Sequence, residues 1–215
     1  MRAVRGDDAP LAAGAHDETT PTVNLLPILM ALRVRGRAKT DALARATGTT
    51  IADVGACVVE AAAAGLIDGD ANGFVLTPAG RAALATALTS EARDRVALAK
   101  LHDAFLAVDA RLKAAVTAWQ VGGSGPVSGA PDAGESSARL AAVAAVATGA
   151  AAIADRLAGV VPRLAPYARR LAAAADALAR GDSRFVASPR VDSLHQVWFE
   201  LHEDLLVTLG RERGA

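Results

Sequence analysis

The chain has 215 residues, 23 of them basic and 23 acidic, so its formal net charge is zero. This length suits one compact domain or two small ones, and the balanced charge excludes a global attraction to nucleic acid or to an anionic membrane. Apolar residues make up 52% of the sequence, many of them alanine, and aromatic residues only 3%. The single cysteine, Cys57, excludes an internal disulfide and a multi-cysteine metal site. We therefore expect a cytoplasmic protein without a metal or another cofactor.

The sequence predicts no membrane segment. The longest uncharged apolar run, Leu140 to Ala154, is too short and too rich in alanine to span a bilayer. Arg2 and Arg5 are not followed by a long apolar stretch, so a signal peptide is not expected.

The first part of the chain is predicted to contain a tail and then helices. Residues 1–20 mix Gly, Pro, Ala, Asp and Thr without apolar periodicity, which is typical of a disordered tail. Apolar residues then recur at helical spacing from Asn24 to Val34. A polar link at 35–39 leads to a brief second helix over Thr40 to Thr47, which Gly48 ends.

A third helix is predicted to begin after this glycine. Thr50 and Asp53 form the Thr-x-x-Asp pattern of a capping box. Cys57 is expected to be a small core residue rather than a redox sensor. Helical spacing places the buried stripe of this helix at Ile51, Val54, Val58 and Ala61 or Ala62.

A β-hairpin and a fourth helix are predicted next. Short apolar runs at 66–67 and 74–76 flank the turn-forming segment 68–73, which ends in Asn-Gly. Thr77-Pro78 is typical of an N-cap followed by proline at the first helical position. The predicted elements follow the order of a winged helix-turn-helix: helix, short helix, glycine turn, capped helix, hairpin and helix.

The residues from Pro27 to Leu84 resemble MarR-type transcriptional regulators. The similarity is carried by AKTDALARATGTTIADVGACVVEAAAAGLI and the following GFVLTPAGRAAL. It implies a winged-helix domain over 21–90, a role in binding DNA, and a homodimer held together by the longer helices.

The second half is predicted to be entirely helical apart from one loop. Ser90 to Gln120 is expected to form one long helix, so that residues 91–120 connect the two domains. The segment 121–137, rich in Gly, Ser and Pro, is predicted to be a flexible loop. Residues 138–215 would form a C-terminal domain with helices over Arg139–Val161 and Pro166–Arg180 and a last helix opening at Ser188-Pro189.

The predicted fold class is therefore mainly α. It consists of an N-terminal winged helix-turn-helix with a small β-hairpin, followed by an all-helical C-terminal domain. Neither a Gly-x-Ser-x-Gly sequence, a Walker sequence nor a dinucleotide fingerprint is present. We therefore predict no catalytic residue and do not expect an enzyme.

The charges of the third helix and the hairpin argue against sequence-specific DNA reading. In winged helices, Arg, Lys, Asn or Gln on this helix reads base edges in the major groove. Here the helix carries Asp53 and Glu60 without Lys or Arg, and the hairpin carries Asp68 and Asp70. Basic residues cluster instead where the first helix meets the second, as either a phosphate clamp or a solvated helix end. The candidates for DNA contact are therefore Arg33, Arg35, Arg37, Lys39, Arg45, Thr49 and Thr50.

The last helix carries the most distinctive polar residues. His195, Trp198 or Phe199, and His202 share one helical face. His195 and His202 lie two turns apart, roughly 10 Å along the axis, so they cannot bind one metal ion together without another helix. The simpler interpretation is that the tryptophan and phenylalanine pack in the core and that the histidines form hydrogen bonds with carboxylates or the backbone. The candidates for contact with a ligand or partner are His102, Trp119, His195, Trp198, His202 and Glu203.

The C-terminal half shows a second resemblance. TAWQ at 117–120, RLAPYARRLAAAADALARGD and VDSLHQVWFELHEDLLVTLGRER are similar to a helical region of actinobacterial proteins related to phosphoenolpyruvate-utilising enzymes of the pyruvate phosphate dikinase type. This resemblance spans most of residues 95–213. The ATP-grasp and phosphohistidine domains of such enzymes are lacking, so it implies an accessory piece rather than the phosphotransferase.

Two functions stay open from the sequence. One is a homodimeric winged-helix regulator of the MarR type, with a pocket for a small effector between its long helices. The other is a non-catalytic accessory subunit whose winged helix docks a phosphoenolpyruvate-utilising phosphotransfer enzyme. The fold resemblance favours the first function, and the acidic third helix and hairpin favour the second.

Overall fold

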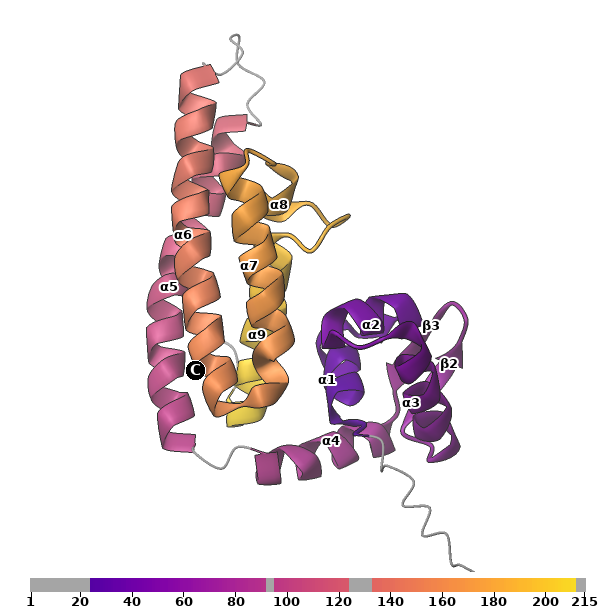
Figure 1. Ribbon diagram of the computed structural model, residues 1–215. Coiled ribbons are helices and arrows are strands. Elements are labelled where there is room, and N and C mark those ends of the chain that lie inside the picture. Colours follow the sequence, from indigo (N-terminus) through magenta and orange to yellow (C-terminus); the bar gives the residue numbers. More distant parts are fainter. Residues whose placement is uncertain (1–23, 92–94, 124–132, 212–215) are drawn as a thin grey trace, which may run out of the picture.

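The computed structural model describes residues 24–91, 95–123 and 133–211, which form two parts (Figure 1). The N-terminal module comprises residues 24–91, the helical module comprises the rest, and each has its own hydrophobic core. The prediction of a mainly α protein with a small antiparallel sheet is confirmed. The predicted tail at 1–20 lies outside the described residues.

The N-terminal module is built around one buried helix. Its elements are α1 (Leu26–Arg35), β1 (Arg37–Ala38), α2 (Thr40–Thr47), α3 (Ile51–Ala63), β2 (Ile67–Asp70), β3 (Gly73–Leu76) and α4 (Pro78–Glu91). The residues from Ile28 to Leu32 in α1 are all buried. Helix α1 lacks a single apolar stripe because it contacts α2, α3, α4 and β3 around it.

Local sequence signals set the ends of α2, α3 and α4. Helix α2 has the predicted bounds and ends at Gly48, which takes the left-handed conformation with φ of 68°. The predicted cap of α3 is confirmed, because the Asp53 amide donates to the Thr50 hydroxyl at 3.1 Å. Thr77 likewise accepts from the Gly80 amide at 3.0 Å and starts α4.

The buried stripe predicted for α3 is partly right. Val54, Val58 and Ala61 are buried, and so is Cys57. Ile51 is instead 61% exposed. It is the first residue of α3, and helical side chains lean toward the N-terminus, so its side chain extends past the end of the core.

The sheet contains the predicted hairpin and one unpredicted strand. Strand β3 is central and pairs antiparallel with both β1 and β2. The turn consists of Ala71 and Asn72, so Asp68, Gly69 and Asp70, which were expected in the turn, belong to β2 instead. The link predicted at 35–39 contains β1, whose two residues are too few for a periodic signal.

The helical module is a bundle of long helices. It contains α5 (Arg95–Gly123), α6 (Ala133–Val160), the short 3₁₀ helix η1 (Pro162–Leu164), α7 (Ala165–Ala179), α8 (Arg184–Ala187) and α9 (Leu194–Leu209). Helix α6 packs against both α5 and α7, and α9 packs against the same two helices. Figure 1 shows these four helices running side by side, with α1 and α2 of the N-terminal module facing α9 and α7.

Three predicted boundaries in this half are wrong. Helix α4 continues to Glu91 and meets α5 at a steep angle (Figure 1), so no single helix starts at Ser90. The loop predicted at 121–137 is shorter at both ends, because α5 extends to Gly123 and α6 begins at Ala133. The last helix begins at Leu194 rather than at Pro189, because residues 189–192 form turns and Ser193, with ψ of 154°, is the extended residue that precedes the helix.

Among the described residues, one helix has the length and composition of a membrane span. The segment Gly134–Val160 of α6 has a mean hydropathy of 1.6 over its most apolar stretch, 28% of which is buried. It is longer than the run from Leu140 to Ala154 on which the sequence prediction depended. Helix α6 also packs against both α5 and α7, and the structure is compatible with a soluble protein.

Candidate functional site

The outward side of α3 and the hairpin is apolar and acidic. Val59 is 71% exposed, and at 100° per residue it lies on the same side of α3 as four exposed alanines. Asp53 and Glu60 lie along one edge of this side. We define the α3–hairpin face as the exposed residues Ile51, Ala52, Asp53, Ala56, Val59, Glu60, Ala62, Ala63, Asp68 and Asp70. None of these residues is basic.

Three of the four acids of the α3–hairpin face are held by local hydrogen bonds. Asp53 accepts from the Thr50 hydroxyl at 2.7 Å, Asp68 from the Gly69 amide at 2.8 Å, and Asp70 from the Asn72 amide at 2.8 Å. None of the four carboxylates forms an ion pair with a residue that the structure describes. The face therefore presents uncompensated negative charge beside an apolar patch.

Cys57 lies behind this face and is not reactive. Burial raises the pKa of its thiol, and the charges of Glu60 and Asp53 raise it further. A thiol held protonated is a weak nucleophile, which agrees with the prediction that Cys57 is a core residue.

The candidates for DNA contact do not form one free surface. The Arg35 side chain is only 15% exposed and forms an ion pair with Glu200 of α9 at 2.7 Å. Arg37 donates to the Gly73 carbonyl at 2.8 Å, and Arg45 pairs with Asp41 at 2.9 Å.

The remaining candidates for DNA contact differ in their surroundings. Thr49 shares a 2.8 Å hydrogen bond with the Thr47 hydroxyl, and Thr50 caps α3. Arg33 is exposed at the rim of a cavity between the modules. Lys39 is exposed beside the two residues of β1. Of the candidates for DNA contact, the exposed cations near the junction of α1 and α2 are therefore Arg37, Lys39 and Arg45.

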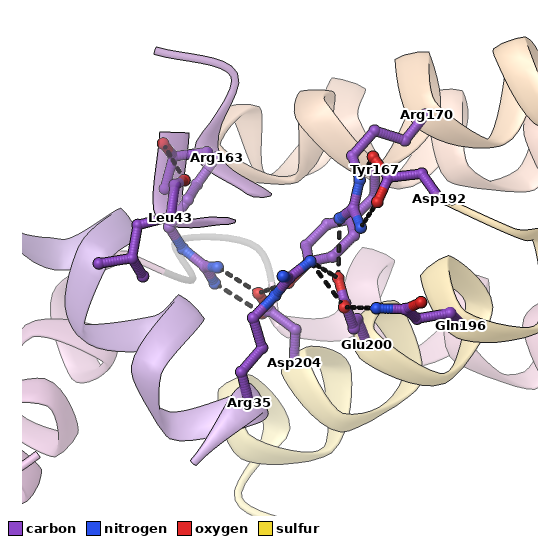
Figure 2. Close-up of polar contacts among 10 residues, drawn as sticks. Arg35, Leu43, Arg163, Tyr167, Arg170, Asp192, Gln196, Glu200 and Asp204 are labelled. Atoms are coloured by element: carbon purple, nitrogen blue, oxygen red, sulfur yellow. Dashed lines mark hydrogen bonds and ion pairs between the residues drawn. The ribbon is translucent and has the colours of Figure 1, made fainter. Parts of the chain in front are cut away.

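A buried ionic network joins the two modules (Figure 2). In its first half, Glu200 of α9 accepts from Arg35 of α1 and from Arg170 of α7, at 3.0 and 2.8 Å. Arg170 also forks onto Asp192 at 2.9 and 3.0 Å, and Gln196 donates to Glu200 at 3.3 Å. One carboxylate of the helical module therefore holds an arginine from each module.

The second half of this network is centred on Asp204, which is fully buried. Arg163 donates to both of its oxygens, at 2.5 and 2.9 Å, and to Glu91 of α4 at 2.8 Å. The hydroxyls of Tyr167 and Thr208 donate to Asp204 at 3.1 and 3.2 Å. We call the set the seam network: Arg35, Glu91, Arg163, Tyr167, Arg170, Asp192, Gln196, Glu200, Asp204 and Thr208.

Arg163 of the seam network keeps its charge despite burial. Burial alone would lower the pKa of Arg163, but the charge and hydrogen bonds of Asp204 and Glu91 raise it above its usual range. Burial raises the pKa of Tyr167, and the nearby carboxylates of Asp204 and Glu200 raise it further, so its hydroxyl stays a donor. Sequence reasoning missed this network, although Glu200 and Asp204 are one turn apart on the last helix.

Three of the six candidates for ligand contact lie together between α5 and α9. Trp198 stacks on Phe105 with 4.0 Å between ring centroids, and His202 lies 5.0 Å from the same ring. His102 lies 5.9 Å from His202. The Trp198 ring nitrogen donates to Asp109 at 2.9 Å. This aromatic cluster is buried packing, and Phe105 is its centre.

The other three candidates are not part of this cluster. His195 is exposed and lines a cavity of about 40 Å³ together with Trp198 and His202. Glu203 is partly exposed, and Trp119 packs against the core near the end of α5. Phe199 is 44% exposed, so the expectation that this phenylalanine packs in the core is wrong. Among the described residues, His, Cys, Asp and Glu side chains form no group of three that could hold a metal ion.

His102 is expected to make folding sensitive to mild acid. Its Nδ1 accepts from Arg211 at 2.9 Å, and its Nε2 is buried without a described partner. Burial lowers the pKa of His102, and the charges of Arg211 and His202 lower it further. The unfolded chain therefore takes up the proton first, and stability falls as pH drops below about 6.5, by at most about 1.4 kcal/mol per pH unit.

This pH dependence is measurable by urea unfolding at several pH values. His102→Leu is expected to flatten the loss of stability between neutral and mildly acidic pH. His195→Gln, at an exposed position on α9, is the matched control and should leave the loss in place. Equal pH profiles for His102→Leu and the unchanged chain would contradict the prediction.

No family model, curated protein or solved structure matches this chain. Its function therefore has to be inferred from its own surfaces. The seam network and the aromatic cluster are largely buried and stabilise the fold, whereas the α3–hairpin face is open to solvent. This face is the candidate site for a macromolecular partner.

Proposed function

We propose that the chain is a non-catalytic regulatory protein that docks a protein partner through the α3–hairpin face of a winged helix-turn-helix. The order of α2, a glycine turn, a capped α3, the β2–β3 hairpin and α4 supports this fold. The observation that carries the function is the composition of the exposed side of α3, which has Val59, alanines and two acids but no cation.

The charges of the α3–hairpin face fit a protein better than DNA. In a major groove, Asp53 and Glu60 would lie near phosphates, and like charges repel. Base edges are read by Arg, Lys, Asn or Gln, which the exposed side of α3 lacks. An apolar patch with an acidic edge complements a partner surface in which apolar side chains are flanked by Lys or Arg. The resemblance of the C-terminal half favours a phosphoenolpyruvate-utilising phosphotransfer enzyme as that partner.

A second candidate function is DNA binding by a homodimer. The exposed cations Arg37, Lys39 and Arg45 at the junction of α1 and α2 favour it, because together they suit a phosphate clamp. Such a clamp would bind DNA with little sequence discrimination and with affinity that falls steeply as salt is added.

Site-specific photocrosslinking in cells distinguishes the two functions. A photoreactive residue replaces Val59 of the α3–hairpin face or, as matched control, the similarly exposed Val96 of α5. We expect an adduct at Val59 that nuclease leaves intact and protease removes, with none at Val96. Mass spectrometry of the adduct then tests whether the partner is a phosphoenolpyruvate-utilising enzyme.

The contrary results are equally distinct. A nuclease-sensitive adduct at Val59, or no adduct there, would contradict protein docking. Gel-shift assays at two salt concentrations complete the test with Arg37→Ala and Lys39→Ala variants. We expect neither substitution to change the protein adduct at Val59. If the unchanged chain instead binds DNA in a salt-sensitive way and both variants lose this binding, the second candidate function is favoured.

A further inference from the structure

A cavity of about 330 Å³ lies where the N-terminal module meets the helical module. Its apolar wall consists of Leu84, Ala85 and Leu88 on α4 and Val207 on α9. A volume of this size is at the lower end of the range for small-molecule sites in proteins. The cavity is larger than the one of about 40 Å³ beside His195 and smaller than one of about 570 Å³ whose lining includes Asp192.

The polar lining of this cavity is strongly cationic. Arg33 of α1, Arg81 of α4 and Arg95 of α5 all line it, and none of the described residues that line it is acidic. Arg81 donates to the Leu76 carbonyl at 3.0 Å, and Arg95 to the Leu209 carbonyl at 2.8 Å. A guanidinium has five N–H donors, so one carbonyl leaves most of them free for another acceptor.

The arginines of the cavity differ from those of the seam network in their carboxylate partners. There, Arg35, Arg163 and Arg170 are each matched by at least one carboxylate within 3.0 Å. None of the three arginines of the cavity forms an ion pair with a carboxylate of the described residues. Among the described residues, positive charge is therefore paired with carboxylates at the buried contact between the modules but not at the cavity.

We propose that this cavity binds a small organic phosphomonoester, which joins a dianionic phosphate to an apolar group. Planar arginine forks match the oxygens of phosphate, and three arginines without a carboxylate partner among the described residues favour a ligand with more than one negative charge. The leucine wall requires an apolar group beside the phosphate, and such a ligand would contact both modules at once. This site is separate from the α3–hairpin face, so the docking proposal and this one can fail independently.

Calorimetric titration of the full chain with 1-naphthyl phosphate tests the proposal. We expect saturation at one ligand per chain, with affinity at least about tenfold higher than for 1-naphthol or for inorganic phosphate. Arg33→Gln and Arg81→Gln should each weaken binding about tenfold, as expected for losing a hydrogen bond to a charged group. Arg156→Gln, at an exposed arginine of α6, is the matched control and should change nothing.

A variant that fills the cavity tests its apolar part without changing charge. Ala85 is exposed and lines the cavity, so Ala85→Phe should block the ligand while circular dichroism stays unchanged. Sedimentation with vesicles containing phosphatidic acid separates the two sources of a phosphomonoester. Vesicle binding that Arg81→Gln abolishes indicates a lipid headgroup, and its absence beside tight 1-naphthyl phosphate binding indicates a soluble ester.

Four results would overturn the proposal. Equal affinity for 1-naphthol would mean a purely apolar cavity, and equal affinity for inorganic phosphate would mean a bare cluster of cations. An effect of Arg156→Gln as large as that of Arg81→Gln would mean non-specific attraction. No saturable binding of 1-naphthyl phosphate would remove the site altogether.

Discussion

Replacing Asp204 by alanine is expected to destabilise the protein by about 3–5 kcal/mol. Asp204 is fully buried, and Arg163 donates to both of its oxygens. Without it, Arg163 keeps Glu91 but loses the larger part of its compensation, and the hydroxyl of Tyr167 loses its acceptor. Urea unfolding followed by tryptophan fluorescence measures the loss of free energy.

An exposed ion pair provides the control for this substitution. Asp41 pairs with Arg45 one turn later on α2, and both side chains are more than half exposed. Exposed pairs of this kind contribute little to stability, so Asp41→Ala should shift the urea midpoint only slightly. A shift for Asp204→Ala no larger than that for Asp41→Ala would show that the buried half of the seam network is not stabilising.

Replacing Glu200 by alanine is expected to uncouple the unfolding of the two modules. Glu200 accepts from Arg35 of the N-terminal module and from Arg170 of the helical module. Its removal leaves two largely buried guanidinium groups near each other with Asp192 as the only described carboxylate partner, a loss of about 3–5 kcal/mol by analogy with other broken buried pairs. The N-terminal module should then unfold at a lower urea concentration than the helical module.

Two spectroscopic signals can follow this separation. Both tryptophans of the sequence, Trp119 and Trp198, belong to the helical module, whereas far-ultraviolet circular dichroism reports helices of both modules. In the unchanged chain the two signals should move together, as in a two-state transition. In Glu200→Ala the dichroism signal should begin to fall first.

Glu135 supplies the matched control for Glu200. Its exposed side chain pairs with Arg139 along α6 at 3.3 Å, so Glu135→Ala should leave the two signals coincident. Coincident transitions in Glu200→Ala as well would mean that other contacts, such as the pair of Arg163 with Glu91 and the packing of α1 on α9, hold the modules together without this carboxylate.

The elements predicted best are those whose ends are set by neighbouring residues. Thr50 and Asp53 cap α3, Gly48 ends α2, and the turn between β2 and β3 lies inside the predicted segment. Each of these signals depends on backbone bonds formed within a few residues, so periodicity and turn chemistry are sufficient to detect them.

The contacts that position the candidate sites depend on distant parts of the chain. Arg35 meets Glu200 across 165 positions, and no local pattern could reveal that it pairs with α9 rather than with a phosphate. The change of direction between α4 and α5 has no glycine or proline to mark it, so a helical pattern continued through it. The exposure of Ile51 and Phe199 likewise follows from tertiary packing and not from spacing alone.

The strand order of the small sheet has a consequence for self-association. Because β3 is the middle strand, the outer side of β2 offers unpaired backbone groups, to which the strand of another molecule can be added. Two of the four residues of β2, Asp68 and Asp70, are exposed acids. Carboxylates on this edge strand repel the same strand of a second copy, which disfavours polymerisation by strand addition. A binding partner must then contact side chains rather than add a strand to the sheet.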